Sequence, residues 1–189
     1  TTKMMDDSDD RGSPPSNTAL HRIPMRLSTG WTIALVTILS LAYAGFLVTH
    51  GTSIASSSDA SGYFNSAKLL LSGEVATPIK KVPHFTPDNG SYYFQQPLGF
   101  AVVEGTTSLI PTYPPGLPLH LLITAQIVGW DHSAILVNVL GALFCGWLTF
   151  LFARRHCHLS ASWAIASMLL LWGCPLFVYF SLQPMSDMP

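Results

Sequence analysis

The chain has 189 residues, of which 49% are hydrophobic and only 10% are charged. Soluble domains carry about a quarter charged residues, so this composition argues against an ordinary water-soluble globular domain. The formal net charge of −1 gives no reason to expect a nucleic-acid or other polyanionic partner. The chain has three cysteines, Cys145, Cys157 and Cys174. They show no regular spacing, and we predict no disulfides.

Residues 1–26 are polar and rich in Asp, Ser, Gly and Pro, which predicts a disordered tail. An apolar run follows at about residues 31–49, and about 20 such residues suffice to cross a membrane as a helix. Arg22 and Arg26 precede this run and place the N-terminus in the cytoplasm. A cleaved signal peptide is the alternative, because small residues follow. The run is nevertheless longer than the roughly 7–15 apolar residues of a signal peptide.

Residues from about 50 to 132 are more polar and predict a large extracytoplasmic loop. Ser56–Asp59 is typical of a helix start, and apolar residues recur on one helical face from Ala60 to Leu71. We expect this helix to lie on the membrane surface. Residues 77–89 contain three prolines and predict a loop. Segments 91–94 and 99–103 predict a loose hairpin.

Two further apolar stretches, at about residues 133–153 and 161–182, are long enough to span a membrane. The first ends at Arg154 and Arg155, which should be cytoplasmic because short loops rich in Arg and Lys stay inside. This topology requires residues 118–130 to lie along the outer interface instead of crossing, since one more crossing would move both arginines outside.

The expected fold is therefore an all-α polytopic membrane protein with three transmembrane helices and a large first extracytoplasmic loop carrying juxtamembrane helices. The chain starts at Thr1 and stops at Pro189, directly after an apolar run. We expect residues 27–189 to be the N-terminal part of a longer transmembrane domain, multi-pass in a bacterial plasma membrane.

Two carboxylates, Asp59 and Asp187, fall on the same membrane face in this topology, each beside an apolar helix. Ionisable groups placed so close to lipid are costly and often functional. The alternative is that both are solvated helix ends, with Asp59 acting as an ordinary N-terminal cap favoured by the helix dipole.

Several short motifs, taken in order, resemble the GT-C glycosyltransferases of family 39, which include protein O-mannosyltransferases and aminoarabinose transferases. The resemblance covers roughly residues 31–189. It is carried by these residues: Ser58-Asp59, Gly62-Tyr63, Ala67, Leu70, Gly73, Tyr113-Pro114-Pro115-Gly116-Leu117-Pro118, Gly129, Asn138, Gly141, Arg154-Arg155 and Ser186-Asp187-Met188-Pro189.

This resemblance implies transfer of a sugar from a polyprenyl-phosphate donor to a protein, lipid or glycan acceptor outside the cytoplasm. Asp59 would be the general base of an inverting reaction, and Asp187 would orient the acceptor or share that role. Some relatives carry a Lys before Pro-Pro where this chain has Tyr113. Lys80, Lys81 and His84 of the same loop are alternative ligands of the leaving phosphate, and Tyr63 and Tyr113 could hydrogen-bond donor or acceptor. The alternatives are interfacial packing for the tyrosines and a solvated loop for the lysines.

No metal site is predicted. His156-Cys157-His158 could suggest one, but adjacent residues at a helix end do not converge on one ion, and an interfacial turn is the simpler interpretation. A divalent cation, the sugar and the acceptor stay open. Two other functions also stay open: a transporter, which needs polar residues along its spans, and a non-catalytic membrane assembly subunit.

Overall fold

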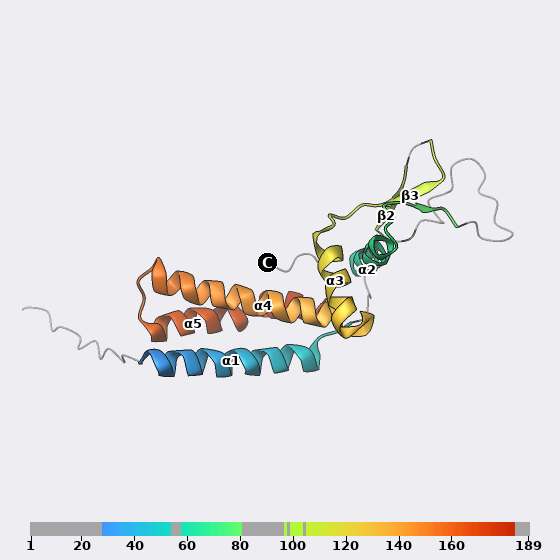
Figure 1. Cartoon of the computed structure of the whole chain (residues 1–189). Coiled ribbons are helices and arrows are strands. Elements are labelled where there is room, and N and C mark those ends of the chain that lie inside the picture. The colour runs from blue at the N-terminus through green and yellow to red at the C-terminus, as the bar shows by residue number, and fades with distance from the viewer. Residues whose placement is uncertain (1–27, 54–57, 81–96, 98, 104, 184–189) are drawn as a thin grey trace, which may run out of the picture.

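The computed structural model describes residues 28–53, 58–80, 97, 99–103 and 105–183. Over these ranges the chain is mostly helical, with a small sheet (Figure 1). Two helices, α1 (Thr29–His50) and α4 (Trp130–Arg155), are long and apolar enough to cross a membrane. Most of their apolar side chains face outward, since only 17% and 22% of the two apolar windows are buried. Such surfaces suit lipid better than water.

The third expected span, residues 161–182, is not one continuous helix. It consists of α5 (Ala161–Trp172) and α6 (Pro175–Ser181), which meet at a bend of 62°. Pro175 begins α6 and has no N–H to donate into the preceding turn, and its ring disfavours a helical Cys174. Cys174 is accordingly extended, with φ −67° and ψ 121°. The chain thus has two candidate spans, or three if the bent pair counts as one.

Helix α4 packs against both α1 and α5, and the three helices run side by side (Figure 1). The small residue Gly146 of α4 makes room for the indole of Trp172, which is only 4% exposed. The indole N–H donates to the Ala142 carbonyl at 3.0 Å. On its other side the indole stacks on Tyr43 of α1, with ring centroids 4.7 Å apart. One tryptophan therefore joins three helices, and burial in this close-packed environment stabilises them.

The ends of α1 and α6 lie together. The Thr52 N–H donates to the Leu182 carbonyl at 3.0 Å, and the Asn138 side-chain amide donates to the Gln183 carbonyl at 2.7 Å. Asn138 is buried in α4, so its amide needs a partner, and the end of α6 supplies one. Helices α1 and α6 thus terminate at the same end of the bundle.

The loop beyond α1 contains the expected helix, α2 (Ser58–Leu71), which is followed by Gly73 with φ +74°. Its buried residues Tyr63, Phe64 and Ala67 pack against Leu121 and Ala134. Protein therefore covers much of this apolar face. The covering residues come from α3 (Gly116–Val128) and α4, and α3 crosses the end of the bundle instead of continuing the line of α4 (Figure 1).

The loop also carries a small antiparallel sheet that an all-α fold did not include. Its strands are β1 (Thr77–Pro78), β2 (Phe100–Val102) and β3 (Ser108–Pro111), in the order β1-β3-β2. Strand β2, within residues 99–103, pairs with β3. The expected hairpin of this segment with residues 91–94 stays a prediction. Residues 91–94 lie outside the described residues. A turn containing Gly105, at φ +76°, brings β2 and β3 together. Because few residues separate the two strands, closing the loop between them costs little conformational entropy.

Candidate functional site

Asp59 lies in the first turn of α2 and is half-buried. A carboxylate at this position is favoured by the unpaired N–H groups and the positive end of the helix dipole. Helix α2, which carries Asp59, packs on α3 and α4 and lies beyond the end of the bundle (Figure 1).

Tyr113, in the link between β3 and α3, contacts Asp59. The Tyr113 hydroxyl donates a hydrogen bond to Oδ1 of Asp59. The two residues are 54 positions apart in sequence. Pairing of β2 with β3 and packing of α2 on α3 together bring them into contact. This hydrogen bond is the central feature of the candidate site.

Two glycines let the Tyr113 ring approach α2 closely. A Cβ added to Gly62 would lie 2.6 Å from the ring carbon Cε2 of Tyr113 and 2.9 Å from the Cα of Gly99. A Cβ added to Gly99 would lie 2.5 Å from the Cα of Gly62 and 2.7 Å from the same ring carbon. Gly99 also has φ +82°, which side-chain-bearing residues rarely adopt. Any larger residue at either position would have to displace the ring.

Tyr63 supports the same ring from within α2. It is 3% exposed, and its ring centroid is 4.6 Å from that of Tyr113, with the planes tilted by 41°. Tilted aromatic pairs at this separation are favourable. Tyr63 thus lies behind Tyr113 as a packing residue.

The pKa of Tyr113 is raised to about 12, first by its hydrogen bond to Asp59, then by desolvation and by the negative charge of Asp59. Ionising the phenol would remove the donated proton and place two negative oxygens side by side. Tyr113 is therefore a neutral donor throughout the physiological range.

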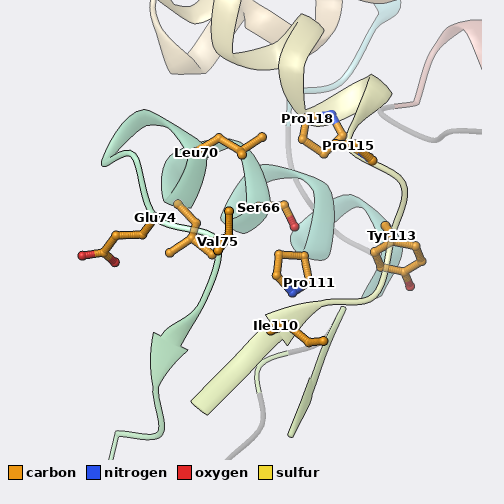
Figure 2. A pocket seen from close by; sticks show the side chains of 10 residues that line it. Ser66, Leu70, Glu74, Val75, Ile110, Pro111, Tyr113, Pro115 and Pro118 are labelled. Carbon is orange, nitrogen blue, oxygen red and sulfur yellow. The ribbon is translucent and has the colours of Figure 1, made fainter. Parts of the chain in front are cut away.

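An apolar pocket of about 230 Å³ lies between α2, the sheet and the start of α3 (Figure 2). Tyr113 stands at one end of it, and the carboxylate of Glu74 points away from it. The Ser66 hydroxyl on its wall already donates to the Gly62 carbonyl at 2.7 Å. Its remaining lining is apolar, from Leu69, Leu70, Val75, Ile110, Pro111, Pro115 and Pro118.

Of the remaining predicted site residues, the structure describes only Lys80. Lys80 is exposed and follows β1. Lys81, His84 and Asp187 lie outside the described residues. Gln183, four positions before Asp187, is at the end of the bundle from which the chain enters α2.

No group of three His, Cys, Asp or Glu side chains is arranged to hold a metal ion within the described ranges. His156 caps the C-terminus of α4, and the turn that contains His158 is held by a 2.7 Å hydrogen bond from Arg154 to the Leu159 carbonyl. The tripeptide His156-Cys157-His158 is therefore part of the α4–α5 turn.

Sequence reasoning named Asp59 and Tyr113 separately and missed their contact, together with the structural roles of Gly62 and Gly99. Searches of protein-family models, curated proteins and solved structures found no match to this chain.

Proposed function

We propose that this chain forms part of a membrane glycosyltransferase that transfers a sugar from a polyprenyl-phosphate donor to an acceptor, with Asp59 as the general base. The observation that carries the proposal is the hydrogen bond from Tyr113 to Asp59. It joins two of the motifs that carry the resemblance to family 39. Helix α2, which contains Asp59, lies beyond the end of the long apolar helices (Figure 1).

The reaction follows from the chemistry of the carboxylate. An acceptor hydroxyl or amine is a weak nucleophile until a base removes its proton. Asp59 would take that proton while the acceptor atom forms a bond to the anomeric carbon. The bond between that carbon and the phosphate oxygen breaks, and the polyprenyl phosphate leaves with the electron pair. Attack from the face opposite the leaving group inverts the configuration of the sugar.

Tyr113 acts in this proposal as a positioning residue. Its hydroxyl donates to one oxygen of Asp59, and its ring is wedged against Gly62 and Gly99. A carboxylate held in this way has less rotational freedom, and a preorganised base needs less rearrangement when the acceptor arrives. Tyr113 thus supports the reaction by orienting Asp59, and the leaving phosphate takes its ligands from elsewhere.

The location suits the proposed donor, whose lipid tail is confined to the bilayer. The site lies at the end of the bundle where α1 and α6 terminate, so a phosphate at the membrane surface can reach it. A transporter is less well supported, because two buried polar side chains of the bundle are paired inside the protein, although the buried Tyr43 hydroxyl has no hydrogen-bond partner among the described residues. Asn138 donates to the Gln183 carbonyl, and the Ser40 hydroxyl accepts from the Trp147 indole at 2.9 Å.

The test is an Asp59→Asn change in the full-length protein, assayed in membranes with a panel of synthetic polyprenyl-phosphate hexoses. Release of polyprenyl phosphate, measured by mass spectrometry, should fall by about 10²- to 10⁴-fold, the usual contribution of a general base. Glu74→Gln is the matched control, since its carboxylate points away from the neighbouring pocket. Full activity of Asp59→Asn at normal expression would refute the assignment.

A Tyr113→Phe variant separates positioning from substrate binding. Loss of a hydrogen bond to a charged group predicts a fall in kcat of about tenfold. KM should change little, because Tyr113 acts on Asp59 and not on the substrate. A raised KM with unchanged kcat would instead place Tyr113 in contact with donor or acceptor.

A further inference from the structure

A second pocket, of about 240 Å³, lies on the side of α2 turned away from the Asp59–Tyr113 contact. Its helical lining is offset by about half a turn from the face that carries Asp59, as expected from 3.6 residues per turn. In contrast to the pocket beside Tyr113, it is largely polar. Its lining residues are Ser53, Ser61, Phe64, Asn65, Lys68, Trp130 and Asp131.

The position of this pocket along the bundle is fixed by the ends of both candidate spans. Ser53 comes three residues after His50, the last residue of α1, and Trp130 and Asp131 are the first two residues of α4. Apolar helices of this length leave the hydrocarbon where they end, so the pocket lies at the depth of the lipid headgroups. Trp130 is the residue type that membrane proteins favour at this depth.

The pocket carries one positive and one negative side chain. The Lys68 ammonium lies over the Trp130 ring, 5.6 Å from its centroid. Asp131 is exposed in the first turn of α4. Lys68 and Asp131 do not form an ion pair with each other in the described part of the chain, so the two charges stay separate within one site. A ligand that carries both charges complements this arrangement, whereas a purely anionic ligand would be repelled by the negative charge of Asp131.

Two uncharged hydrogen-bonding side chains, those of Asn65 and Ser61, lie on the same side of the pocket as Lys68. Asn65 and Ser61 lie within hydrogen-bonding distance of each other, 3.5 Å from Nδ2 to Oγ, and they share one face of α2 with Lys68. Amide N–H, hydroxyl and ammonium groups together suit a phosphate, which accepts several hydrogen bonds at once. Phe64 is 8% exposed and packs beside Trp130, forming an apolar base beneath the polar groups.

We propose that this pocket binds the headgroup of a phospholipid that carries both a phosphate and a primary ammonium, as phosphatidylethanolamine does. The phosphate is held by Lys68 with Asn65 and Ser61, and the ammonium by Asp131. The bound lipid holds α2 at the membrane surface from the side opposite the Asp59–Tyr113 contact. This proposal concerns a different site from Asp59 and stands whether or not the chain transfers sugar.

The test is lipid retention by the purified full-length protein in detergent, measured by native mass spectrometry with equal amounts of phosphatidylethanolamine and phosphatidylglycerol. The second lipid has the phosphate but lacks the ammonium. The wild type should retain phosphatidylethanolamine preferentially. Lys68→Gln should weaken the binding of both lipids about tenfold, as loss of a charge-assisted contact predicts. Asp131→Asn should weaken the binding of phosphatidylethanolamine alone and so abolish the preference for that lipid.

Arg155→Gln is the control for a lost basic residue, because Arg155 is exposed at the opposite end of α4. It should leave the ratio of the two lipids unchanged. Soluble glycerophosphoethanolamine should displace the bound lipid if the headgroup is recognised. Equal retention of both lipids by the wild type would overturn the proposal, as would an unchanged preference in Asp131→Asn. Lys68 and Asp131 are both exposed, so neither substitution should unfold the protein.

Discussion

A Gly99→Ala substitution tests whether the Tyr113 ring is wedged against α2. Gly99 has φ +82°, and forcing an alanine into a left-handed conformation costs about 1–2 kcal/mol. The new Cβ would also lie 2.5 Å from the Cα of Gly62, and such overpacking costs about 1–3 kcal/mol more. The expected total is about 2–5 kcal/mol. Because Gly62 belongs to α2, this strain should weaken the packing of that helix.

Gly105 provides a matched control. Its φ is +76°, but a Cβ there would meet nothing within 4 Å. Gly105→Ala should therefore show only the conformational cost, about 1–2 kcal/mol. Hydrogen exchange of the α2 amides reports local opening. The difference of about 1–3 kcal/mol predicts exchange about 5- to 150-fold faster in Gly99→Ala than in Gly105→Ala. Equal exchange in the two variants would show that the ring is not wedged at this position.

Three further predictions concern the hydrogen bond, the bundle and the topology. The pKa of Tyr113 is raised to about 12, so its donation to Asp59 stabilises the fold fully below pH 10 and is lost as the pH rises through about 12. In an ultraviolet titration, Asp59→Asn should lower the pKa of one tyrosine from about 12 toward 10. Titration curves identical to those of the wild type would contradict the contact. Trp172→Ala should destabilise the bundle by about 3–5 kcal/mol in thermal unfolding in detergent, and a loss below about 1 kcal/mol would show that the indole does not join the helices. With the other cysteines replaced, Cys157 and an introduced Val75→Cys should react with an impermeant maleimide from opposite sides of the membrane, and reaction of both from one side would refute the span assignment.

Local patterns predicted most of the helices, although the third apolar run was expected as one helix and is divided into α5 and α6. Long apolar runs predicted the spans near α1 and α4, because a helix that faces lipid must be apolar along its whole length. The recurrence of apolar residues from Ala60 to Leu71 predicted α2, since a helix brings residues three and four apart onto one face. The break before α6 could also have been found, because Pro175 follows Gly173 within the third apolar run.

The contacts between distant segments were decided only by the tertiary structure. Nothing near Asp59 in the sequence indicates that Tyr113, 54 residues later, donates to it. That contact depends on the pairing of β2 with β3, on the crossing of α3 over the bundle end and on two glycines that admit the ring. Sequence periodicity reports which face of an element is buried, whereas the identity of the partner is set by how the elements pack in space.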